Sequence, residues 1–178
     1  IWADGPLTVS GGGSLLVTSG AITHTGSGSP YSVGLYCQGD LTVQSGSLTC
    51  TGGKALSMTD SMAFSNGVKL ATDASLTVTG GSLTCVGGES MEQEEDGLSA
   101  SFSRGLYLYR GNVAVSGSGR LTALCDSVMD DESLAWGVYV LMGDLTVSDS
   151  AQVSARGTTA IEVLGDVLVS GGSLTART

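Results

Sequence analysis

Four short phrases of this chain place a glycine, an apolar residue and then a tyrosine or lysine in a row. They read GLYC, GVKL, GLYLY and GVYVL, and their third positions are Tyr36, Lys69, Tyr107 and Tyr139. A tyrosine combines an apolar ring with a polar tip, so several tyrosines on one surface can stack on sugar rings. Tyrosine also favours strands and pairs across them. Carbohydrate contact and plain strand packing are therefore both open interpretations of these residues.

Acidic residues form the second group that could do chemistry. Nine of the 17 acidic residues fall in two segments, ESMEQEEDG and DSVMDDES. Carboxylates held close together favour a hard divalent cation such as calcium. A solvated run of charge is the alternative, because the spacing matches no calcium-binding loop. Calcium is the one cofactor considered, with these candidate ligands: Glu92, Glu94, Glu95, Asp96, Asp130 and Asp131.

The chain contains few residues of the types that act in catalysis. The single histidine, His24, is expected to point inward, so a Ser-His or Cys-His nucleophile is not supported. No glycine-rich loop follows a strand and opens a helix, which argues against nucleotide chemistry. We expect a non-enzyme. A calcium-dependent polysaccharide lyase is a further alternative, with Lys69 and Arg104 as the basic residues near the acidic segments.

The overall charge limits the partners. A net charge of −10 with seven Lys and Arg residues argues against nucleic acid, because phosphates are bound through clustered cations. No apolar run approaches the roughly 20 residues of a membrane-spanning helix. Cations or neutral ligands such as polysaccharides are the expected partners.

A repeated phrase predicts the elements that position these side chains. It reads GDLTVQSGSLTCTGG, ASLTVTGGSLTCVGG, GDLTVSDSAQVSARG and GDVLVSGGSLTART, each with two short alternating segments. A third alternating segment, which holds the tyrosines, precedes each phrase. Alternation with glycine-rich turns is typical of β-strands, and repetition at this period is typical of solenoids. The sequence predicts an all-β, single-stranded parallel β-helix (β-solenoid), right-handed, with three strands per coil and about five coils. A β-sandwich is the rival fold.

The repeat assigns equivalent positions in successive coils. The first strand is expected to start at Leu15, Leu41, Leu76, Val113, Leu145 and Val167. The second is expected at Ile22, Leu48, Leu83, Leu121, Val153 and Leu174. The third is expected at Leu7, Leu35, Val68, Leu106, Val138 and Ile161. The outward column of the third strand then reads Thr8, Tyr36, Lys69, Tyr107, Tyr139 and Glu162.

Length variation concentrates in one corner, between the second and third strands. That corner holds the acidic segments and is the expected binding side, because insertions on one face of a solenoid often line its binding surface. Trp136 and other apolar residues of this corner, including Phe64 and Phe102, are expected to pack beneath the loops, with Trp136 as an alternative ligand platform. The candidate ligand-binding residues are Tyr36, Lys69, Tyr107, Tyr109, Tyr139 and Trp136.

The cysteines are expected to point inward. His24, Cys50, Cys85, Ala123, Ala155 and Ala176 are predicted to form one inward column of the second strand, where cysteine acts as a small apolar residue. Whether Cys50 and Cys85 are bridged stays open, since adjacent coils bring their Cα atoms within disulfide range.

The repeated phrase resembles the Gly/Ser/Thr-rich β-helix repeat regions of secreted or wall-attached surface proteins of anaerobic gut bacteria. More remotely, the chain is similar to pectate-lyase-like β-helical carbohydrate-binding domains. The resemblance implies an extracellular or cell-surface location and a non-catalytic, adhesin-like binding module for polysaccharide or host glycan. A purely structural spacer is the alternative. Residues 1–178 would form one domain, an excerpt of a longer surface protein with neighbouring domains as partners.

Overall fold

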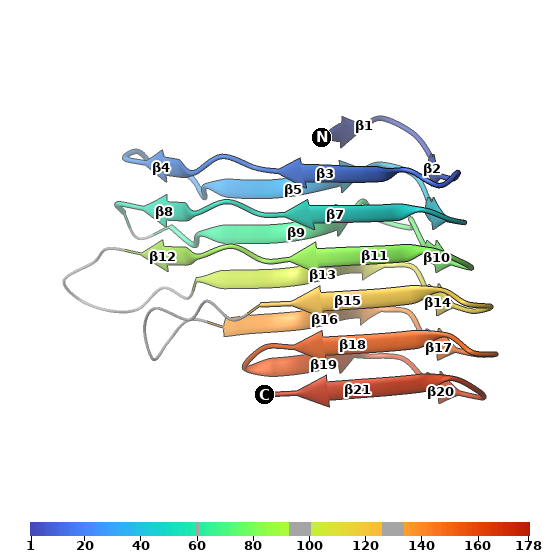
Figure 1. Ribbon diagram of the computed structural model, residues 1–178. Coiled ribbons are helices and arrows are strands. Elements are labelled where there is room, and N and C mark those ends of the chain that lie inside the picture. Colours follow the sequence, from blue (N-terminus) through green and yellow to red (C-terminus); the bar gives the residue numbers. More distant parts are fainter. Residues whose placement is uncertain (60, 93–100, 126–133) are drawn as a thin grey trace.

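The computed structural model describes residues 1–59, 61–92, 101–125 and 134–178, and every regular element in them is a β-strand. The strands stack as parallel rungs of one solenoid, with the N-terminal and C-terminal rungs at opposite ends (Figure 1). This arrangement confirms the predicted all-β parallel solenoid, because a β-sandwich is built from antiparallel strands. The described part of the chain contains no helix long and apolar enough to cross a membrane.

Sheet A carries the tyrosines, as predicted for the third strand of each coil. Its strands pair in the order β1-β5-β9-β13-β16-β19. They are β1 (Trp2–Ala3), β5 (Tyr31–Cys37), β9 (Phe64–Leu70), β13 (Phe102–Arg110), β16 (Leu134–Met142) and β19 (Thr159–Val163).

Sheets B and C contain the two strands of the repeated phrase. Sheet B consists of β2 (Leu7–Val9), β6 (Leu41–Val43), β10 (Leu76–Val78), β14 (Val113–Val115), β17 (Leu145–Val147) and β20 (Val167–Val169). Sheet C consists of β3 (Ser14–Thr18), β7 (Ser47–Thr51), β11 (Ser82–Val86), β15 (Arg120–Leu124), β18 (Gln152–Arg156) and β21 (Ser173–Arg177).

A fourth, shorter sheet lies in the corner that was expected to contain only loops. Sheet D pairs β4 (Ile22–His24), β8 (Ala55–Ser57) and β12 (Ser90–Glu92) of the first three coils. The prediction of three strands per coil is therefore incomplete for these coils. These strands read ITH, ALS and SME, which share no apolar pattern from coil to coil, so the repeat did not predict them.

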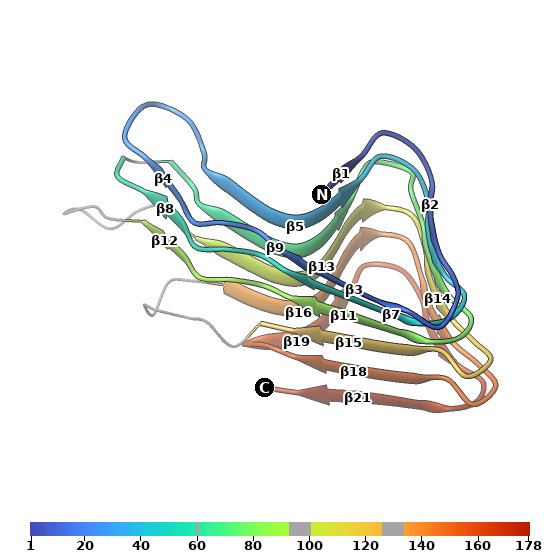
Figure 2. The ribbon, with the colours of Figure 1, turned by 45° about the horizontal axis from the view of Figure 1, so that its top comes forward.

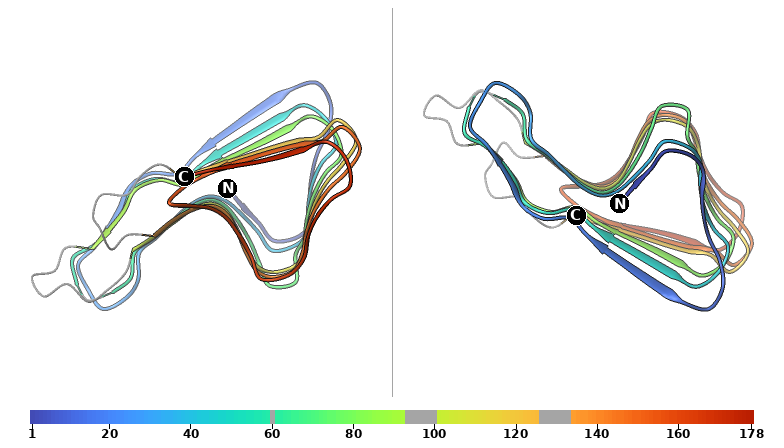
Figure 3. Two further views of the ribbon diagram at one scale, coloured as in Figure 1. Left: turned by 90° about the horizontal axis from the view of Figure 1, so that it is seen from below. Right: turned by 90° about the horizontal axis from the view of Figure 1, so that it is seen from above.

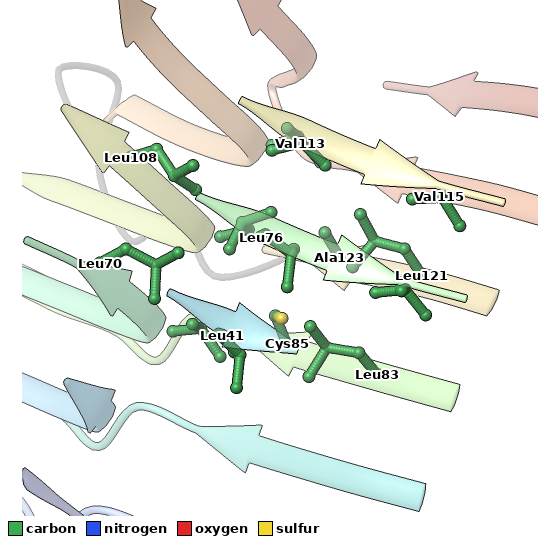
Figure 4. Close-up of a cluster of buried hydrophobic side chains, with 14 of the residues drawn as sticks. Leu41, Leu70, Leu76, Leu83, Cys85, Leu108, Val113, Val115, Leu121 and Ala123 are labelled. Carbon is green, nitrogen blue, oxygen red and sulfur yellow. The ribbon is translucent and has the colours of Figure 1, made fainter. Parts of the chain in front are cut away.

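The core consists of stacked apolar side chains between sheets A, B and C. Leu41, Leu76, Leu83 and Leu108 are fully or almost fully buried, together with smaller residues of the same columns (Figure 4). Burying a leucine side chain contributes about 1.5–3 kcal/mol relative to leaving it exposed. Because each column repeats from rung to rung, this burial also fixes the register of the parallel strands.

The four cysteines are buried as small apolar residues, and Cys37, Cys50 and Cys85 are free thiols. Cys50 and Cys85 lie in register on neighbouring strands of sheet C, unbridged. Burial raises the pKa of the Cys50 thiol to about 12.

A column of glycines bends every long strand of sheet A. At Gly34, Gly67, Gly105 and Gly137 the backbone comes so close to sheet C that a Cβ atom would lie within 3.0 Å of backbone atoms. At Gly67, for example, a Cβ would be 2.5 Å from the Val86 nitrogen. Only glycine tolerates this approach. Figures 2 and 3 show the result: the coil outline is pinched, and the outer face of sheet A is concave at the pinch.

Buried serines hold the pinched region together from inside. The Ser65 hydroxyl donates to the Gly53 carbonyl at 2.8 Å and accepts from the Gly88 N–H at 2.9 Å. Ser32, one rung away, accepts from the Gly53 N–H at 2.9 Å. These bonds satisfy backbone groups that would otherwise be buried without partners.

The predicted alignment of the first coil is wrong by one strand. Leu7 pairs with Leu41 in sheet B, Leu15 pairs with Leu48 in sheet C, and Ile22 pairs with Ala55 in sheet D. Apolar residues recur every seven or eight residues in this stretch, which is also the spacing of neighbouring strands. The pattern therefore fits equally well when it is shifted by one strand.

Two side-chain assignments change with this correction. Thr8 lies beside Thr42 in sheet B, and Trp2 takes the place predicted for Thr8, next to Tyr36. His24 pairs with Ser57, whereas Val17 holds the place beside Cys50 that was predicted for His24.

Candidate binding surface on the concave face of sheet A

The predicted tyrosine column exists and lies on one side of the bend. Tyr36, Lys69, Tyr107 and Tyr139 are consecutive partners in sheet A, and Glu162 follows Tyr139. Each of these side chains is half-buried. The Tyr107 and Tyr139 rings stack with centroids 5.6 Å apart. The centroid of the exposed Trp2 ring lies 4.3 Å from the centroid of the Tyr36 ring.

A second aromatic column lies on the other side of the bend. The Tyr31 and Phe64 rings stack at 4.5 Å, and the Phe64 and Phe102 rings at 5.3 Å. The Trp136 ring joins the two columns, since it lies 6.0 Å from Phe102 and 5.0 Å from Tyr139. Phe64, Phe102 and Trp136, which were expected to pack beneath the corner loops, thus belong to strands of sheet A, and the longest of those loops lie outside the described residues. The three side chains face outward on the strand because the glycine bend turns this part of sheet A into a wall of the concave face.

Two cations lie between these columns. The Lys69 Nζ atom is 4.8 Å from the centroid of the Tyr31 ring, 5.9 Å from Tyr36 and 5.7 Å from Tyr107. Such cation–π contacts contribute from about 0.5 to about 2 kcal/mol as the cation loses water. Neither Lys69 nor Arg104 forms an ion pair with any residue of the described part.

Arg104 lies deeper, at the centre of the rings. Its Cζ atom is 4.5–5.7 Å from the ring centroids of Phe64, Phe102, Tyr107, Trp136 and Tyr139. It is only 7% exposed, and its Nε atom has no hydrogen-bond partner. Its register partner Asn66 is fully buried, and both amide atoms of Asn66 lack partners.

Burial disfavours charge on this face. It lowers the pKa of Arg104, an effect that the neighbouring tyrosines partly offset. Burial, and secondarily the charge of Arg104, lowers the pKa of Lys69. Burial raises the pKa of the Tyr107 hydroxyl, which therefore stays protonated at neutral pH. Two positive groups thus sit among neutral rings.

Two hollows open on either side of Lys69. One, of about 480 Å³, is lined by Trp2, Tyr31, Tyr36 and Lys69 with Ile1, Ser19 and Val33. The other, of about 320 Å³, lies between Tyr36, Lys69, Tyr107 and Tyr109 and the turn at 70–72. Both volumes fall in the range of small-ligand sites. Tyr36 and Lys69 line both hollows, so one extended ligand can occupy both.

Trp136 supports the surface rather than presenting a platform. Only 7% of the residue is exposed, and its Nε1 donates to the Glu162 carboxylate at 2.7 Å. Glu162 thereby closes the C-terminal end of the tyrosine column with an acidic residue.

The predicted calcium ligands cannot be placed. Glu94, Glu95, Asp96, Asp130 and Asp131 lie outside the described residues, and the Glu92 side chain is not described either. Among the residues that the structure does describe, no group of three His, Cys, Asp or Glu side chains is arranged to hold a metal ion. Glu89, at the edge of the acidic corner, pairs with Lys54 at 3.4 Å.

Sequence reasoning missed Trp2, Tyr31, Phe64, Phe102, Arg104 and Asn66 as members of this surface. A longer phrase around each bend glycine carried the signal for most of them. YSVGLY, FSNGVK, FSRGLY and LAWGVY share a large apolar or aromatic residue, a small buried residue, a variable residue and the bend glycine. The expected strands began at the glycine, so the residues before it were assigned to loops.

Comparison with protein-family models, curated proteins and solved structures found no match to this chain.

Proposed function

We propose that this protein is a non-catalytic carbohydrate-binding module that binds polysaccharide on the concave face of sheet A. The observation that carries the proposal is the pair of aromatic columns, with two hollows between half-exposed tyrosines. Aromatic faces stack on the apolar faces of sugar rings, and tyrosine hydroxyls can bond to sugar hydroxyls. The proposed surface lies beside the acidic corner rather than in it.

The shape of the surface favours an extended ligand. Successive rungs of a parallel sheet are about 4.8 Å apart, so the columns repeat their chemistry along the solenoid axis. A polysaccharide chain lying along this axis would meet Tyr36, Lys69, Tyr107 and Tyr139 in turn. Longer oligosaccharides should therefore bind more tightly than single sugars, because each added unit reaches a further rung.

A binding role fits this surface better than catalysis does. His24, the single histidine of the chain, belongs to sheet D and not to the concave face. Among the described residues, the surface offers rings and cations but no pair of carboxylates for acid–base work on a glycosidic bond. We place the module outside the cell, on a bacterial surface, where polysaccharides are accessible.

The test is binding to a panel of polysaccharides in affinity gels and by calorimetry. The variant Tyr36→Ala/Tyr107→Ala/Tyr139→Ala removes three rings at about 1 kcal/mol each, so binding should weaken about a hundredfold. The matched control Thr42→Ala/Thr77→Ala/Thr146→Ala changes the outer face of sheet B and should bind normally. Circular dichroism would verify that both variants fold. Equal binding by both variants, or no binding by the unmodified chain, would refute the proposal.

A further inference from the structure

Lys69 is a cation whose position favours the binding of an anionic ligand. It is half-buried among three tyrosine rings, it lines both hollows, and it has no ion-pair partner in the described part of the chain. Two other cations of the chain do form ion pairs: Lys54 pairs with Glu89, and Arg110 pairs with Asp73 at 3.2 Å.

Arg104 adds a second positive charge beneath Lys69. Buried cations are normally paired with carboxylates, because the loss of water is otherwise uncompensated. Here the rings supply part of the compensation, yet the Arg104 Nε and the Asn66 amide have no hydrogen-bond partner within the part of the chain that the structure describes. These two neighbouring positive charges have no carboxylate partner among the described residues, which makes this the place on sheet A where an anionic group gains most.

We propose that the carbohydrate bound by the concave face is acidic, and that Lys69 holds its carboxylate or sulfate group. This inference rests on the proposed function and specifies its ligand class. The sugar rings would stack on Tyr36 and Tyr107 in the two hollows, which places the anionic group between them at the Lys69 ammonium. Arg104 acts as a positioning residue that keeps the local potential positive.

The net charge of −10 predicts cations or neutral ligands as partners. The charges nearest to Lys69 nevertheless determine which ligand the concave face prefers. Charges more than about 8 Å apart are largely screened at physiological ionic strength. Glu162, the acidic residue at the end of the column, is engaged by the Trp136 Nε1. It lies two rungs beyond the hollows around Lys69, past Tyr107 and Tyr139.

A nucleic acid fits this surface less well. Single-stranded nucleic acids also stack on aromatic rings, but they carry one phosphate per nucleotide and need a track of cations along the strand. The tyrosine column offers Lys69 alone, and it ends at a carboxylate. A single lysine in the column therefore favours a polymer whose anionic groups are more widely spaced than the phosphates of a nucleic acid, or one that binds through a single anionic group.

The experiment compares each acidic polysaccharide with the same polymer stripped of its charge. Alginate is paired with carboxyl-reduced alginate, and dextran sulfate with dextran, in calorimetry at low and physiological salt. We expect at least one charged polymer to bind about tenfold or more tightly than its uncharged partner, since hydrogen bonds to charged groups contribute about 1.5–3 kcal/mol. The preferred pair distinguishes a carboxylate from a sulfate. Binding should also weaken as salt is added.

Variants at Lys69 assign the effect to this residue. Lys69→Gln should weaken binding of the charged polymer about tenfold or more and leave the uncharged polymer unaffected. Lys69→Arg should restore it. Lys54→Gln is the matched control, because it also removes one lysine charge but lies next to β8 in sheet D.

Three results would overturn the inference. Equal binding of charged and uncharged polymers would leave carbohydrate binding intact and refute the anionic ligand. An equal loss in Lys69→Gln and Lys54→Gln would refute the role of Lys69. Tighter binding of a single-stranded oligonucleotide than of any polysaccharide would replace the ligand class. Absence of binding to every polysaccharide would instead refute the proposed function itself.

Discussion

Replacing Gly67 by alanine tests the physical origin of the concave face. A Cβ atom at Gly67 would lie 2.5 Å from the Val86 nitrogen, 2.8 Å from the Val86 oxygen and 2.8 Å from the Gly105 oxygen. All three are backbone atoms of neighbouring strands. No side-chain rotation can relieve the contact, so sheet A must move away from sheet C at the bend.

The expected cost follows from these distances. Ordinary van der Waals contact to a Cβ begins near 3.4 Å. The backbone must therefore shift by most of an ångström. Overpacking of this kind costs about 1–3 kcal/mol. For a chain of 178 residues, a loss of about 2 kcal/mol lowers the Tm by about 4–8 °C.

The assay is thermal unfolding followed by circular dichroism, with Gly20→Ala as the control. Nothing lies within 4 Å of a Cβ built at Gly20, and its φ is not in the left-handed region. Alanine there should be neutral or stabilising by about 0.4–1 kcal/mol, because it restricts the unfolded chain. Gly67→Ala should thus lower the Tm, whereas Gly20→Ala should leave it unchanged or raise it. A Gly67→Ala variant as stable as Gly20→Ala would refute the steric account of the bend.

Three further predictions concern the pinch, the thiols and the charge on Lys69. Ser65→Ala removes a buried hydroxyl and leaves the Gly88 N–H without its partner; it should lower the free energy of unfolding by about 1–3 kcal/mol. Ser47→Ala, where an exposed hydroxyl bonds to Ser14, should change it by less than about 0.5 kcal/mol in urea titrations. Ellman's reagent should detect free thiol from all four buried cysteines in denaturant and almost none in the native protein; a missing pair in denaturant would indicate a disulfide. Burial lowers the pKa of Lys69 below its ordinary value of 10.5, so the ammonium loses its proton earlier as pH rises. Binding of an acidic polysaccharide should weaken as the pH rises through this lowered pKa, and Lys69→Arg should abolish that loss; a pH-independent affinity of the unmodified protein would contradict it.

The sequence predicted the fold in most of its detail because each coil repeats the same alternation. The columns that include Leu41, Leu76 and Val113 in sheet B were assigned correctly from period-2 patterning and equal spacing alone. The same was true of the column from Tyr36 to Glu162. In a parallel solenoid, equivalent positions of successive repeats are neighbours. Residues that recur along the chain at the repeat period therefore lie side by side in the structure.

The sequence failed where that pattern was short or interrupted. The first coil could be shifted by one strand because its apolar residues are evenly spaced. Sheet D was missed because its strands, ITH, ALS and SME, do not repeat a common apolar pattern as the equally short strands of sheet B do. The bend glycines looked like turn residues, and this hid the outward positions of Phe64, Phe102 and Arg104. A glycine inside a strand often marks a tight bend or the close approach of another backbone. Here that approach creates the candidate surface.

A structure of the protein in complex with an oligosaccharide from the tightest-binding polymer tests the central claim most directly. We predict sugar rings stacked on Tyr36 and Tyr107, a chain running along the solenoid axis, and an anionic group within hydrogen-bond distance of the Lys69 Nζ. An oligosaccharide bound to any other face, with the hollows around Lys69 empty, would contradict the account.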